Sequence, residues 1–233
     1  MKKSLRGEPT ARLLSCLLPA LLLAGLCLSL SPAARAETTP SVKELASRVD
    51  HHYNSLHSLT TAFVQSYTGM GMHKRETGVL LLRKPGRMLW TYTDPNGKLY
   101  VLNGRYGYFY TPGQTEAQRV PASKLDDLQS PLRYLLGHTR LMRELPDLHI
   151  IGEQNGVYTL VGVPKGMGKS IASVTLKVTG DGYIHEIAMT QTDGVTNALA
   201  FSGETDNVPA PNSAFEFHPP DGVYVVNSLT PVE

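Results

Sequence analysis

Cysteine is almost absent from this chain. Its only two cysteines, Cys16 and Cys27, lie within the first 36 of 233 residues, and that segment has the composition of a cleaved export signal. The exported remainder would therefore contain no thiol. This excludes disulfide bonds, thiol catalysis, thiolate zinc sites and iron–sulfur clusters, so the hydrophobic core must stabilise the fold alone.

Long blocks of one charge are also lacking. The chain has 22 Lys and Arg against 20 Asp and Glu, a formal net charge of +2. Because the first 36 residues contain five basic side chains and one acidic one, their removal leaves a net charge of −2. A mildly acidic domain without basic stretches is not expected to bind nucleic acid.

The N-terminus has the three parts of a signal peptide. Four basic side chains within the first 12 residues precede an apolar run over residues 13–30, and residues 34–36 (Ala-Arg-Ala) match a small-x-small cleavage site. We therefore expect a cleaved signal peptide over residues 1–36, export to the periplasm, and a single domain over residues 37–233.

Two alternatives remain for this segment. The apolar run is near the lower length limit of a transmembrane helix, so it is also compatible with an uncleaved anchor. Lipidation at Cys27 is the other alternative, although Leu26 stands where a lipobox has a small residue.

A helix is predicted shortly after the cleavage site. Ser41 and Glu44 have the spacing of a capping box. Apolar residues then follow with helical periodicity, at Val42, Leu45, Ala46, Val49, Tyr53 and Leu56. The periodicity favours a helix packed on a sheet over one that plugs the mouth of a sheet.

From Thr60 onward the pattern is that of short β-strands separated by turns rich in Gly, Asn, Asp and Pro. Strand–helix–strand alternation is missing, which excludes a doubly wound parallel sheet. We expect an antiparallel meander, strongly twisted and curled into an incomplete barrel. Met88, Trp90 and Tyr92 alternate along one strand, so they share a large apolar face that covers a core or lines a pocket.

A short helix is predicted over residues 131–137, with Pro131 in its first turn and Gly137 at its end. Leu132, Leu135 and Leu136 form its apolar face. The pattern is equally compatible with a cap on the open end of a barrel and with a connector on its outer rim.

Residues that would assemble a catalytic, metal or cofactor site are not evident. Residues 163–170 end in Gly-Lys-Ser but lack the first glycine of a phosphate-binding loop and lie between strands. Helical spacing places no two of His51, His52 and His57 one turn apart with a carboxylate, so we interpret them as surface residues. We therefore expect no enzyme activity, no metal and no cofactor.

Taken in order, several blocks of the sequence resemble the LolA family of periplasmic outer-membrane lipoprotein carriers. The similarity extends over most of the exported chain and depends on the number and order of the blocks. The matching blocks are residues 56–65 with Phe-x-Gln, Gly78, residues 84–92 with Trp-x-Tyr, residues 103–112, residues 130–136, Asp181-Gly182 and residues 215–223.

The resemblance implies a mainly β fold, a half-open antiparallel barrel covered by short helices that include a lid. It implies a monomeric chaperone that takes lipoproteins from an ATP-driven inner-membrane release complex, shields their acyl chains and delivers them to an outer-membrane acceptor. The implied lipid-binding residues are Met88, Trp90, Tyr92, Leu132, Leu135 and Leu136, with the lid latched by Lys84 and Arg87.

Two residues depart from the family pattern. Lys84 stands where the family has an arginine that helps to hold the lid closed, and lysine lacks the bidentate fork of arginine. Met88 stands where an aromatic residue is common, and its flexible side chain suits varied acyl chains. Two other functions remain open: a lipid-binding or sensor module of the envelope with the same fold, and a hydrolase with an unrecognised site.

Overall fold

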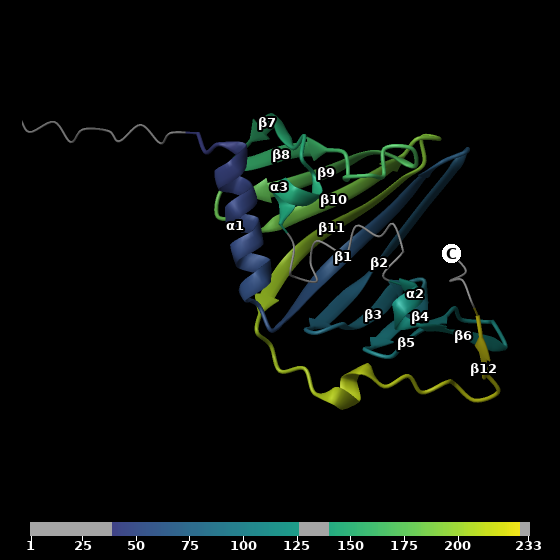
Figure 1. Cartoon of the computed structure of the whole chain (residues 1–233). Helices are drawn as coiled ribbons and strands as arrows, with labels where there is room; N and C mark the ends of the chain where they lie inside the picture. Colours follow the sequence, from purple (N-terminus) through teal and green to yellow (C-terminus); the bar gives the residue numbers. More distant parts are fainter. Residues whose placement is uncertain (1–38, 126–139, 229–233) are drawn as a thin grey trace, which may run out of the picture. The chain divides into compact units, whose positions relative to one another are not determined.

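The computed structural model describes residues 39–125 and 140–228, and within these ranges the chain is mainly β (Figure 1). The helices are α1 (Val42–Ser55), the short α2 (Ala122–Leu125) and α3 (Leu141–Glu144), and the 3₁₀ turn η2 (Asn212–Phe215). The strands are β1 (Ser58–Gly69), β2 (Met72–Arg83), β3 (Arg87–Asp94), β4 (Asn96–Asn103), β5 (Tyr106–Tyr110), β6 (Glu116–Pro121), β7 (His149–Gln154), β8 (Val157–Gly162), β9 (Ile171–Thr179), β10 (Ile184–Gln191), β11 (Thr196–Asp206) and β12 (Tyr224–Asn227).

These strands form one open sheet in the order β12-β6-β5-β4-β3-β2-β1-β11-β10-β9-β8-β7. The predicted antiparallel meander is confirmed for every neighbouring pair but one, because β12 runs parallel to β6. A tight hairpin forces neighbouring strands to be antiparallel, whereas β12 follows β11 through a long connection that contains η2. That connection passes beside β3 and β4, which η2 contacts, and it sets the direction in which β12 arrives (Figure 1).

Helix α1 begins where the sequence predicts it. The Ser41 backbone N–H donates to Glu44 Oε2 at 2.7 Å, and the Glu44 N–H donates to Ser41 Oγ at 3.3 Å, which completes the capping box. The periodic apolar residues face the sheet, and Leu45, Ala46, Val49 and Tyr53 are fully buried. The helix therefore packs on the sheet.

Gly182, in the turn between β9 and β10, allows this close packing. It has a φ of +103°, and a Cβ there would lie 2.6 Å from the backbone carbonyl carbon of Arg48 in α1. Any side chain would therefore push the turn away from the helix.

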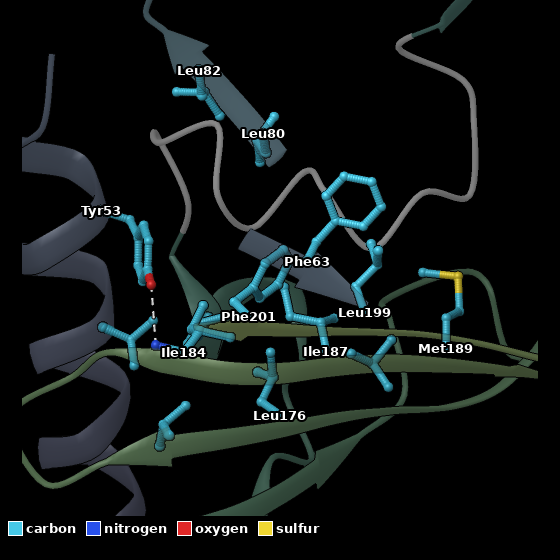
Figure 2. Close-up of a cluster of buried hydrophobic side chains, with 14 of the residues drawn as sticks. Tyr53, Phe63, Leu80, Leu82, Leu176, Ile184, Ile187, Met189, Leu199 and Phe201 are labelled. Carbon is cyan, nitrogen blue, oxygen red and sulfur yellow. Dashed lines mark hydrogen bonds between the residues drawn. The ribbon is translucent and has the colours of Figure 1, made fainter. Parts of the chain in front are cut away.

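The core lies between α1 and one face of the sheet (Figure 2). Buried residues alternate with more exposed ones along most strands, for example at Val174, Leu176 and Val178 on β9, as a sheet with one covered face requires. The buried set continues across β10, β11, β1, β2 and β3, so the core is one contiguous cluster rather than separate patches.

Glu76 is a charged exception among these buried side chains. It accepts hydrogen bonds from Lys98 Nζ at 2.7 and 2.9 Å, and Lys74 Nζ lies 2.9 Å away. Burial raises the pKa of this carboxyl, but the two lysines lower it by more, so that its pKa lies below the ordinary value of 4.5. The ionised form of Glu76 is therefore favoured in the folded state.

This arrangement predicts a loss of stability in acid. Because the pKa is lower in the folded than in the unfolded chain, the ion pairs stabilise the fold above pH 4.5, and the contribution is lost as the pH falls through the folded-state value. Urea unfolding at pH 7 and at pH 3 to 4 is expected to show a smaller pH dependence for Glu76→Gln than for the wild type. The same substitution at exposed Glu116 is the control, and an equal effect at both positions would contradict the prediction.

Candidate functional site

Met88, Trp90 and Tyr92 lie on one face of β3, as their alternation predicts. Their exposed fractions are 4%, 2% and 8%. Neighbouring strands extend the same face, since Trp90 pairs with Leu80 on β2 and with Tyr100 on β4. A row of apolar side chains therefore crosses three strands at this level of the sheet. Whether that row accepts lipid stays a prediction.

Aromatic rings form the centre of this face. The Phe63 ring centroid lies 4.6 Å from that of Trp90 and 5.1 Å from that of Tyr92, both with edge-to-face geometry. Phe63 is opposite Gly78 on the neighbouring strand, and Gly78 is in turn opposite Tyr92. The missing side chain at Gly78 thus leaves the space in which the ring of Phe63 meets the ring of Tyr92.

The polar atoms on this face differ in whether they have hydrogen-bond partners. Trp90 Nε1 is buried, and within the described part of the chain it has no hydrogen-bond partner. The Tyr92 hydroxyl donates to Gln65 Oε1 at 3.4 Å, and Lys98 Nζ lies 4.4 Å from the centre of the Tyr92 ring. Burial raises the pKa of Tyr92, so its hydroxyl stays neutral. The face is apolar at Trp90 and becomes polar beyond Tyr92.

The structure places one of the two predicted latch residues at the end of α1. Lys84 Nζ donates a hydrogen bond to the backbone carbonyl oxygen of Tyr53, and burial lowers the pKa of this ammonium group. A cation bound to a carbonyl in the last turn of a helix also interacts favourably with the helix dipole. Arg87 is half-buried at the start of β3 and pairs across the turn with Arg83.

Arg83, at the end of β2, contacts the segment that follows β11. Its guanidinium donates to the Ala210 carbonyl oxygen and to the Asn212 side chain, and it lies 5.2 Å from the centre of the Phe215 ring. These contacts hold the segment after β11 against the sheet. The predicted lid residues Leu132, Leu135 and Leu136 lie outside the described residues.

Several important residues were missed by the sequence patterns. Phe63 and Leu80 lie at the centre of the apolar face, and only the Phe-x-Gln element of the resemblance pointed to the first. The interpretation of His52 as a surface residue is wrong: its side chain is 13% exposed and its Nε2 lies 2.8 Å from Glu204 Oε1. His51 and His57 are exposed, as expected.

Glu204 connects this histidine to the core. Its other carboxylate oxygen, Oε2, accepts a hydrogen bond of 2.9 Å from the Tyr53 hydroxyl, which itself accepts one from the Ile184 N–H at 3.0 Å (Figure 2). Burial raises the pKa of Glu204, although hydrogen bonds from His52 and Tyr53 oppose the rise. Tyr53 thus ties α1 to both β10 and β11.

The fold and this face together define a mainly β, open-sheet protein with one continuous, buried apolar face. A family model described as "Outer membrane lipoprotein carrier protein LolA" matches residues 54–218. The chain belongs to this LolA family.

Curated relatives agree with the family match. An outer-membrane lipoprotein carrier protein of Chromobacterium violaceum is 26% identical over 212 residues, which cover 91% of this chain and 98% of that protein. The protein of the same name from Salmonella paratyphi A is 26% identical over 195 residues. This match covers 84% of this chain and 92% of that protein.

Similar solved structures have low sequence identity to this chain. An uncharacterized conserved protein from Thermus thermophilus superposes with a TM-score of 0.51 at 13% identity and covers 79% of this chain and 98% of its own. A LolA superfamily protein from Nitrosomonas europaea gives a TM-score of 0.41 at 10% identity, covering 77% and 99% of the two chains. In the part of the chain that the structure describes, every helix is too short or too polar to cross a membrane.

Proposed function

We propose that this protein is a periplasmic chaperone that binds the acyl chains of lipoproteins released from the inner membrane and delivers them to an outer-membrane acceptor. An ATP-driven release complex would be the donor, and the protein would act as a carrier rather than as an enzyme. Family membership supports this function. The observation that carries it is the continuous apolar face around Phe63, Leu80 and Trp90.

The physical need for such a face is large. Each methylene of an acyl chain exposed to water costs about 0.8 kcal/mol, so a lipoprotein cannot cross the periplasm at a useful concentration without a shield. Flexible and aromatic side chains such as Met88, Phe63 and Trp90 can rearrange around chains of different length.

Release is as important as binding. The side chains of the apolar face are buried against one another. Cargo must displace these contacts, which lowers its net affinity and favours transfer to an acceptor that binds it more tightly. We propose that Lys84 contributes to this equilibrium by holding the end of α1, and that Arg87 and the lid residues Leu132, Leu135 and Leu136 assist closure over the lipid-binding face.

The single tryptophan provides a direct test. Purified protein mixed with a triacylated lipopeptide whose chains carry bromine is expected to lose most of its Trp90 emission, because bromine quenches only rings that it contacts. The non-brominated lipopeptide measures any change that is not due to contact, and the unacylated peptide is expected to have no effect.

A relocated tryptophan is the matched control. Val79 lies next to Leu80 on β2 but on the opposite face, where it is 44% exposed, and it pairs with Thr91. The double variant Trp90→Phe, Val79→Trp is expected to bind the lipopeptide without quenching. Equal quenching in both proteins would contradict binding at the apolar face, and equal binding of the unacylated peptide would favour a sensor that recognises protein instead.

A further inference from the structure

Three side chains from distant parts of the sequence converge beside the last turn of α1. His52 comes from the helix, and Glu204 and Asp206 come from β11, where their spacing of two places both on one side of the strand. His52 Nε2 lies 2.8 Å from Glu204 Oε1 and 3.9 Å from Asp206 Oδ1. One donor atom from each of the three residues lies within 4.8 Å of the other two.

The surroundings orient these atoms. Glu204 Oε2 is occupied by the hydroxyl of Tyr53, so that Oε1 is turned toward His52. Asp206 Oδ2 lies 3.5 Å from the Tyr183 hydroxyl, whereas Asp206 Oδ1 is buried and has no hydrogen-bond partner among residues 39–125 and 140–228. A buried carboxylate oxygen without a partner is costly, and this one faces the histidine nitrogen.

The donor set has the chemistry of a transition-metal site. Two carboxyl groups gathered beside one imidazole form a donor set that the positive charge of a metal ion would complement. One nitrogen and two carboxylate oxygens suit Zn²⁺ and related ions, whereas Ca²⁺ and Mg²⁺ prefer oxygen ligands alone. The Tyr53–Glu204 hydrogen bond is the kind of outer contact that orients a ligating carboxylate.

We propose that His52, Glu204 and Asp206 form a binding site for a divalent transition-metal ion such as Zn²⁺, which fastens the end of α1 to β11. The side chains of His52 and Glu204 are 13% and 10% exposed, while that of Asp206 is 30% exposed and gives the ion access from solvent. The site lies where the end of α1 meets β11, and it does not depend on the proposed lipid binding.

The test is a zinc titration of the chelator-treated exported protein in competition with a chromophoric chelator. One equivalent of zinc is expected to bind, and His52→Gln and Asp206→Asn are each expected to weaken that binding by at least about tenfold. His51→Gln is the matched control, since His51 precedes His52 but is exposed, and it is expected to bind zinc as the wild type does.

Thermal unfolding gives a second readout. At a free zinc concentration about 100 times the Kd, the Tm of the wild type is expected to rise by about 5–10 °C, and the Tm of Asp206→Asn is not. Calcium is expected to have no such effect. Should His52→Gln fail to fold, Asp206→Asn decides the question, because its side chain is the most exposed of the three.

The proposal is wrong if the wild type shows no saturable zinc binding. It is also wrong if the zinc affinity of a folded His52→Gln or Asp206→Asn variant falls by less than tenfold, because the ion would then be bound elsewhere. In either case the three side chains form a polar cluster that does not bind the ion.

Discussion

Replacing Gly78 with alanine is expected to lower the free energy of unfolding by about 3 kcal/mol. A Cβ at this position would lie 2.3 Å from the Thr91 carbonyl oxygen and 2.8 Å from two atoms of the Phe63 ring. Thr91 pairs with Val79 on β2 and with Leu99 on β4, so its backbone cannot move without disturbing the sheet. The ring cannot move without leaving its contacts with Trp90 and Tyr92.

Urea unfolding followed by circular dichroism measures this loss. Gly152→Ala is the matched control, because Gly152 is also a strand glycine but has no atom within 4 Å of the position of a Cβ. Its effect is expected to stay within about 0.5 kcal/mol. If the two variants unfold at the same urea concentration, the prediction is wrong and the close packing at Gly78 does not contribute to stability.

Truncating Trp90 to alanine is expected to cost about 3–5 kcal/mol, because it empties the centre of the apolar face. Trp90→Phe is expected to cost less than half as much. Phenylalanine keeps most of the ring contacts with Phe63. It also removes a buried indole N–H that has no hydrogen-bond partner among the residues that the structure describes.

Urea unfolding of both variants measures these costs. Thr91→Ala is the control, because Thr91 follows Trp90 but is exposed, and this variant is expected to change the free energy of unfolding by less than about 0.5 kcal/mol. Equal costs for Trp90→Phe and Trp90→Ala would show that the indole nitrogen has a partner in solution. A folded Trp90→Phe protein is also what the relocated-tryptophan experiment requires, so this measurement precedes the lipid titration.

Local patterns in the sequence determined the elements and the apolar face. The capping box at Ser41 and Glu44 and the periodicity that follows specify α1, because both act within one or two helical turns. The alternation of Met88, Trp90 and Tyr92 specifies their common face, because side chains on a strand repeat every two residues. The order of the motif blocks identified the family, which the family match confirms.

Only the tertiary structure decided which distant residues meet. Gly78 belongs to the motif blocks, but only the register of β1, β2 and β3 shows that it lies between Phe63 and Tyr92. The parallel arrival of β12 depends on a long connection that carries no strand pattern. His52 and Glu204 are 152 residues apart, and no periodicity extends over that distance. Their contact arises because the packing of α1 on the sheet, and not any local signal, sets the position of the helix end over β11.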